Sequence, residues 1–109
     1  MVGAVTTRRQ TRTALLEVLQ RTLLEGPGEA SPAVRAAAAA GAGEGALGTY
    51  AQQVQVAAYK VTADQMAQLQ KNHSDDVLFE VTVCAAFGAA RQRHDAALAL
   101  LDAAWETGS

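Results

Sequence analysis

One uninterrupted stretch decides the fold: residues 74–105, SDDVLFEVTVCAAFGAARQRHDAALALLDAAW. Ser74 is a favourable N-cap, and Asp75 and Asp76 follow it in the first turn, where negative charge stabilises the positive end of the helix dipole. No proline interrupts the stretch. It therefore predicts a single helix of about 31 residues, roughly 46 Å long at 1.5 Å per residue.

Apolar and small residues recur at helical spacing along this predicted helix. From Val83 onward the steps alternate four and three, close to a heptad repeat, and His94 fills the position between Ala90 and Ala97. A small protein can cover such a helix only with its other helices or with another subunit. The members of this stripe are Phe79, Val83, Phe87, Ala90, Ala97, Leu101 and Ala104.

The composition favours one helical domain that associates with itself. The chain has 109 residues, which predicts a single domain over residues 1–109, and half of the residues are apolar but only 5% are aromatic. Much of the apolar fraction is alanine, which favours helix but buries little area per residue. A chain of this kind gains stability by sharing a helical face with a partner, so we expect a homo-oligomer.

The charges and the single cysteine narrow the class of protein. The net charge is −2, and the basic residues are scattered apart from Arg8, Arg9 and Arg12, so we expect no nucleic-acid partner. One cysteine allows no intrachain disulfide and suits a reducing compartment. There is no apolar leader and no run long enough to span a bilayer, which predicts a cytoplasmic protein with no membrane partner.

The first half of the chain predicts two short helices and a glycine-rich loop. Residues 1–6 are expected to be frayed, and residues 7–24 form an amphipathic helix that ends at the Gly-Pro-Gly of residues 26–28. Ser31 and Pro32 are favourable N-cap and N1 residues for a second helix over residues 33–40, with Gly41 as its stop. Four glycines in residues 41–48 indicate a flexible loop.

Two capping boxes then predict two helices that meet at a corner. Thr49 and Gln52 open one that runs to about Lys60, and Thr62 and Gln65 open the next. Val61 and Met66 complete a hydrophobic staple for the second box, whose helix ends at Asn72 in a left-handed conformation. No strand pattern remains, so the predicted fold class is all-α, a helical bundle of about five helices with a long C-terminal helix.

The second half of the chain resembles a known superfamily. Residues 61–90 read VTADQMAQLQKNHSDDVLFEVTVCAAFGAA, and this string, continued to Leu98, is similar to the carboxymuconolactone decarboxylase and alkylhydroperoxidase D-like superfamily. Members carry a similar turn followed by an alanine-rich helix, and some small members have a similar Gly-Pro-Gly-Glu leader. The resemblance implies an alkylhydroperoxidase D-like helical bundle that assembles as a trimer or hexamer.

The chain departs from that superfamily where the redox chemistry would lie. Peroxidase-type members carry Cys-x-x-Cys-x-x-x-His upstream of the turn, together with an assisting glutamate. The corresponding positions here hold Ala57, Lys60 and Asp64. Redox cycling needs a second thiol to resolve the first, and Cys84 has none. We interpret Cys84 as a small buried core thiol rather than a reactive thiol aided by Arg91.

Three residues of the long helix are candidates for a catalytic site. Glu80 and Arg91 share a helix face, as a buried ion pair or as part of a polar stripe at a subunit interface. His94 lies on the apolar stripe, where a packing role competes with acid–base catalysis. The spacing of His, Asp and Glu predicts no metal site, and no cofactor is expected.

Two functions from different classes follow. The first is a member of the decarboxylase-like family that has lost the thiol peroxidase motif and persists as a non-redox binding or assembly module. The second is a cysteine-independent enzyme of the decarboxylase branch, in which Glu80, Arg91 and His94 bind and protonate a small organic acid. The missing redox motif favours the first.

Overall fold

The chain folds into five α-helices and one short 3-10 helix. The structure, a computed structural model, describes residues 2–108, and the side chains of residues 10–106. No strand occurs in the described range, so the predicted all-α fold class is confirmed. The elements are α1 (Val2–Glu25), α2 (Pro32–Ala39), α3 (Gly45–Ala57), η1 (Ala58–Lys60), α4 (Ala63–Asn72) and α5 (Asp75–Gly108).

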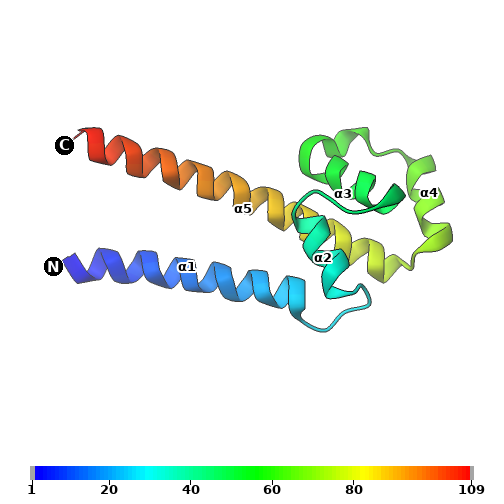
Figure 1. The fold of residues 1–109 in the computed structure, drawn as a ribbon, viewed down its shortest axis with the longest axis horizontal. Helices are drawn as coiled ribbons and strands as arrows, with labels where there is room; N and C mark the ends of the chain where they lie inside the picture. Colours follow the sequence, from blue (N-terminus) through cyan, green and yellow to red (C-terminus); the bar gives the residue numbers. More distant parts are fainter. Residues whose placement is uncertain (1, 109) are drawn as a thin grey trace.

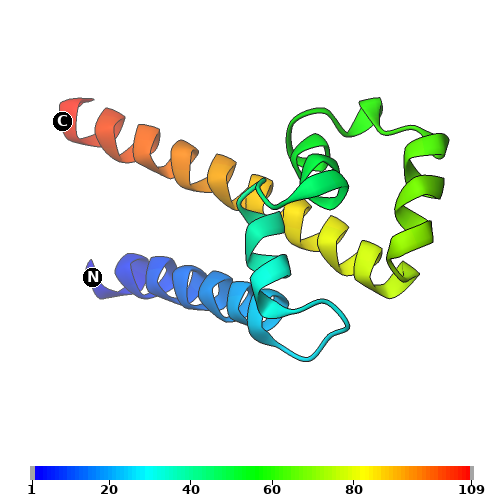
Figure 2. The same ribbon diagram turned by 45° about the vertical axis from the view of Figure 1, so that its right-hand side comes forward.

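The molecule has a body and two arms. Helices α2, α3 and α4 gather around the first half of α5, and this is the body (Figure 1). Residues 2–20 of α1 and residues 90–108 of α5 extend from the body in the same direction, and we call these two segments the arms. A view turned by 45° shows the same arrangement (Figure 2). The molecule is elongated as a result, with extents of 57 × 29 × 19 Å.

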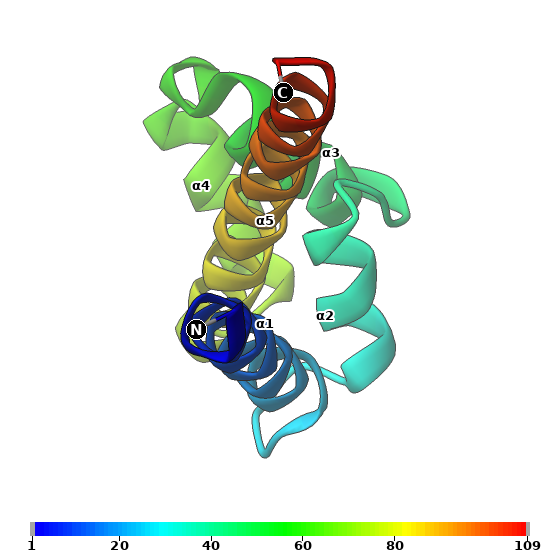
Figure 3. The ribbon, with the colours of Figure 1, turned by 90° about the vertical axis from the view of Figure 1, so that its left-hand side faces the viewer.

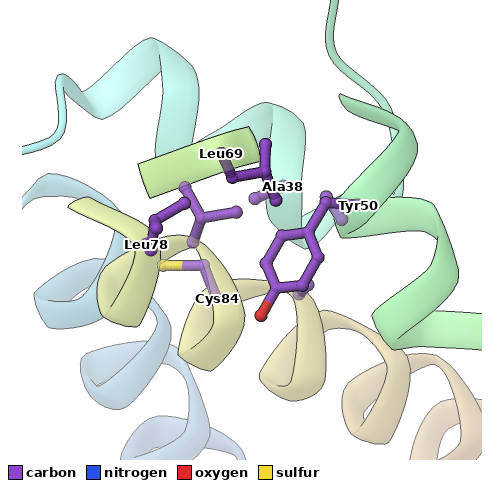
Figure 4. Close-up of a cluster of buried hydrophobic side chains, with 8 residues drawn as sticks. Ala38, Tyr50, Leu69, Leu78 and Cys84 are labelled. Carbon is purple, nitrogen blue, oxygen red and sulfur yellow. The ribbon is translucent and has the colours of Figure 1, made fainter. Parts of the chain in front are cut away.

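The core lies in the body and is built mostly from small side chains (Figure 4). Its closest approach is the crossing of α2 over α5, where a Cβ added to Gly88 would lie 1.9 Å from the Ala39 carbonyl oxygen. The alanine-rich α2 therefore lies close to α5 at Gly88. The core members are Ala38, Tyr50, Ala51, Leu69, Leu78, Val81, Cys84 and Ala85.

Both predicted ends of α2 are confirmed. The Val34 N–H donates to Ser31 Oγ at 3.2 Å, with Pro32 at the first helical position. At the other end Gly41 has φ +68°, a conformation that favours glycine. The Gly41 N–H donates to Ala38 O and the Ala42 N–H to Ala37 O, which together form a Schellman motif.

The predicted start of α3 is wrong. The helix begins at Gly45 with Glu44 as N-cap, so half of the expected loop is helical and Thr49 does not cap the helix. The Thr49 hydroxyl instead donates to the Gly45 carbonyl oxygen within the helix. The earlier start buries Tyr50 to 5% exposure, and this packing prevails over the local capping signal.

One of the two hydrogen bonds predicted for the capping box of α4 is present. The Gln65 N–H donates to Thr62 Oγ1 at 3.1 Å, but the Gln65 side chain donates to Gln53 of α3. Asn72 is the last residue of α4, and no described residue other than glycine has a positive φ, so the left-handed end is wrong. The chain leaves α4 through an extended His73 because Ser74 must cap α5, and the Val77 N–H donates to Ser74 Oγ.

The two long helices extend beyond their predicted ranges. Helix α5 runs from Asp75 to Gly108 and continues unbroken through Gly88. Helix α1 begins at Val2, so the expected frayed segment is helical from residue 2 onward.

Candidate functional site

Glu80 holds the loop between α1 and α2. Its carboxylate accepts the Ala30 N–H at 2.6 Å and the Glu29 N–H at 2.9 Å. These two hydrogen bonds, that from Ala30 first, lower the pKa of Glu80 below its usual value. A Cβ added to Gly28 would lie 2.5 Å from Glu80 Oε1, so this glycine allows the close approach. Glu80 is thus an ionised carboxylate with a structural task.

Arg35 performs a similar task at the C-terminal end of α1. It is 4% exposed, and its guanidinium donates to the Leu23 carbonyl oxygen at 2.9 Å and to the Gly26 carbonyl oxygen at 2.5 Å. These are among the carbonyl groups that a helix end leaves without partners. The sequence reasoning missed Arg35, although it is the one charged residue of the alanine-rich α2. A single charged residue within an alanine-rich helix was the feature of the sequence that could have identified it.

Cys84 completes this junction as a buried thiol. It is 1% exposed, and Sγ donates to the Leu23 carbonyl oxygen at 3.6 Å. Burial raises the pKa of the thiol. The predicted buried core thiol is confirmed. We call Arg35, Glu80, Cys84 and the residue 23–30 segment that they bind the hinge junction.

The three predicted catalytic residues have different partners. Arg91 and Glu80 are eleven positions apart, about 16 Å along a helix. Arg91 Nε donates to Asp95 at 3.1 Å, and Nη1 donates to Gln20 of α1 at 3.5 Å. His94 Nδ1 lies 3.2 Å from the same Asp95 carboxylate. The His94 and Arg91 hydrogen bonds lower the pKa of Asp95, the His94 bond being the larger cause. Arg91 and His94 thus share a partner, and Glu80 does not.

Two hollows stand out on the surface, and neither unites the candidate residues. A groove of about 370 Å³ lies between α2 and α3, with an almost entirely apolar lining in which Glu44 is the charged residue. A polar hollow of about 350 Å³ lies between α1 and α5 at the base of the arms. Arg91 lines the second hollow, together with Glu17, Gln20, Arg21, Leu24 and Glu25, but Glu80 and His94 line neither.

The positions at which the sequence resemblance predicts the redox motif lie at the corner between α3 and α4. Ala57 ends α3, Lys60 ends η1 and Asp64 is in the first turn of α4. Cys84, the free cysteine, is buried against α1 and lies outside this corner. Among the described residues, no group of three or more His, Cys, Asp and Glu could hold a metal ion.

The stripe of α5 lies on the face that the body leaves uncovered. Phe79 is 69% exposed, Leu101 64% and Trp105 80%, while Val83 and Phe87 are half-buried. The residues that α5 buries are on the opposite side of the helix, and they are Leu78, Val81, Cys84, Ala85, Gly88 and Ala89.

The arm of α1 also exposes large apolar side chains. Leu15 is 58% exposed, Val18 55% and Leu19 44%. Together with the α5 stripe, these residues leave an apolar surface that runs along both arms. We call this surface, made of the α5 stripe, Trp105, Leu15 and Leu19, the open face.

No helix in the described range is long and apolar enough to cross a membrane. Comparisons with models of protein families, with curated proteins and with solved structures find no match to this chain.

Proposed function

We propose that this chain is a non-redox assembly module that works as a homo-oligomer through its arms, in a reducing cytoplasm. The proposal follows the sequence resemblance to carboxymuconolactone decarboxylase-like proteins, against which this chain has alanine, lysine and aspartate where the thiol peroxidase motif would lie. Copies of the chain bind one another through the open face and form a stable assembly.

The observation that carries this proposal is that one chain has more accessible surface than a compact monomer of the same mass. We call this difference the surplus. The accessible surface is 7614 Å², whereas a compact monomer of this mass has about 5,700 Å². The radius of gyration is 17.1 Å, against about 13 Å for a compact domain of this length. The surplus of roughly 1,900 Å² exceeds the ~800 Å² that each partner contributes to a stable interface.

The chemistry of that surplus favours a protein partner. Of the nine large hydrophobic residues that are exposed among the described side chains, seven lie on α1 and α5. Large apolar side chains that gather on one exposed surface are typical of a protein interface. A second copy is the partner because the same surplus exists on every chain, and mutual burial removes it from both.

Sedimentation analysis of two matched double variants tests the proposal. We expect the wild-type chain to be oligomeric at micromolar concentration, and Leu101→Ser with Trp105→Ser to be monomeric. Val56→Ser with Tyr59→Ser is the control, because these residues are 75% and 85% exposed but lie in α3 and η1. A monomeric wild-type chain, or equal dissociation of both variants, would contradict the proposal.

The enzyme alternative lacks an observation of this kind. The carboxylate of Glu80 is held by two backbone N–H groups, and a lowered pKa keeps it ionised near neutral pH. A general acid or base works best with a pKa near the operating pH. A catalytic role for Glu80, Arg91 and His94 therefore stays a prediction from the sequence and is not part of the proposed function.

A further inference from the structure

The apolar residues of the two arms lie on the same side of the pair. The contacts Cys84 to Leu23 and Arg91 to Gln20 fix the line along which α5 faces α1. On a helical wheel with about 100° per residue, Leu101 of α5 and Leu19 of α1 each lie roughly 70–90° away from the direction in which the two helices face each other. Both residues are displaced toward the same side of the helix pair. Helix α2 lies on the other side of the pair, as the view along the arms shows (Figure 3). The open face is therefore a single two-helix layer.

The α5 stripe has an internal symmetry about position 92. Counting His94, six of its positions fall into pairs that lie 9, 5 and 2 residues on either side of position 92, and Phe79 pairs with Trp105 of the open face at 13 residues, whereas Ala104 has no partner in the stripe. The outermost pair is two aromatic residues, the next is two aliphatic residues, and the third sets a large residue against a small one. The pairs are Phe79 with Trp105, Val83 with Leu101, Phe87 with Ala97, and Ala90 with His94.

We infer that two copies of this chain pack open face to open face with their arms antiparallel, around a two-fold axis at position 92 of α5. This inference rests on the proposed function and specifies its partner and register. A two-fold interface requires that a residue facing another receive the reciprocal contact. In this arrangement each member of the four pairs faces the other member on the second copy.

The same axis brings opposite charges together on α1. Gln20 lies beside Arg91, so the axis crosses α1 near Leu19, at the centre of its exposed apolar residues. By backbone position, Arg12 of one copy then falls across from residue 26 of the other, next to Glu25. A parallel arrangement would place Arg12 of both copies side by side, where the two charges repel. Charge therefore favours the antiparallel arrangement.

Disulfide trapping between two different cysteine variants tests the register. Chains carrying Phe87→Cys are mixed with chains carrying Ala97→Cys, and diamide is added as the thiol oxidant. We expect cross-linked heterodimers, since positions 87 and 97 face each other across the axis. Position 87 of one chain would lie about 15 Å along the helix from position 87 of the other chain, and the same holds for position 97. Homodimers of either variant are therefore too far apart to form a disulfide. The wild-type chain is the blank, because its Cys84 is buried.

A second pair of cysteine variants keeps the test valid if Phe87→Cys or Ala97→Cys itself weakens the interface. Ala90→Cys with His94→Cys changes exposed side chains near the axis and should give the same heterodimer. Ala96→Cys, on another side of α5, should give no cross-link. Ala97→Cys homodimers in an oligomeric protein would indicate parallel arms and overturn this inference alone. A monomeric wild-type chain, measured in the same samples by sedimentation, would overturn the proposed function as well.

Discussion

The body and the arms distribute apolar side chains in opposite ways. In the body, the largest side chains with less than 2% exposure are Val81 and Cys84, and half of the buried hydrophobic residues in the described range are alanines. In the arms, Trp105 is 80% exposed and Leu101 64%. Burial of large apolar side chains is the main source of folding stability. The body is packed by close backbone approach, as at Gly88, while the arms leave larger apolar side chains exposed, which the proposed oligomer would bury.

The largest expected effect comes from the closest approach in the body. Gly88→Ala should raise intrinsic helix propensity by about 1 kcal/mol. The added methyl group would nevertheless meet the backbone of Ala39 at 1.9 Å, and backbone cannot rotate away. We expect net destabilisation of about 1–3 kcal/mol, as for an overpacked core, measured by urea unfolding of the variant and the wild type. A stabilised variant would show that α2 does not press on α5.

The arms should give a concentration-dependent stability that the body lacks. If the open face is buried between copies, the Tm of the wild-type chain should rise with protein concentration by mass action. Leu101→Ser with Trp105→Ser should remove that dependence and lower the Tm at high concentration. Differential scanning calorimetry over a hundredfold concentration range checks this. A wild-type Tm that stays constant over that range would mean that the arms are not an interface.

The hinge junction should respond to the loss of its guanidinium. Arg35→Ala removes two hydrogen bonds from a charged donor to buried carbonyl groups, and we expect a loss of about 2 kcal/mol in unfolding free energy. Arg93→Ala is the matched control, because Arg93 is exposed and donates one bond to Gln55 O. Its effect should stay within about 0.5 kcal/mol. Equal losses for the two variants would remove the special role of Arg35.

The smallest expected effect is the pH dependence due to Glu80. Its pKa is lowered in the folded state, so its contribution is present above the unfolded pKa of about 4.3 and is lost as pH falls through the folded value. Glu80→Gln cannot titrate, so its unfolding free energy should decline less than that of the wild type between pH 5 and pH 3. Chemical denaturation at the two pH values measures the difference. Identical declines would mean that the hydrogen bonds to Ala30 and Glu29 do not discriminate between charge states.

The parts of the fold that were predictable are those with strong local signals. The N-caps Ser31, Thr62 and Ser74 and the glycine stop at Gly41 were confirmed because each satisfies backbone groups within a few residues. Thr49 shows the limit of this reasoning. Its capping pattern is as good as that of Thr62, but tertiary burial of Tyr50 moves the helix start to Gly45.

The candidate site was predictable only in part, for a similar reason. Sequence periodicity placed Glu80 on a helix face with Arg91, but its partners are backbone N–H groups of residues 29 and 30, about fifty positions away in the chain. Periodicity within one helix carries no information about such partners. The stripe of α5 was identified correctly as a pattern, whereas its exposure depends on where α2 and α3 pack.

Both described ends of the chain lie at the tips of the arms, at one pole of the molecule (Figure 1). Any domain joined genetically to either tip would therefore be carried to that pole. In the antiparallel pair the two poles point in opposite directions, so two such cargoes would be held apart by the full length of the bundle. The chain would then act as a rigid bivalent spacer.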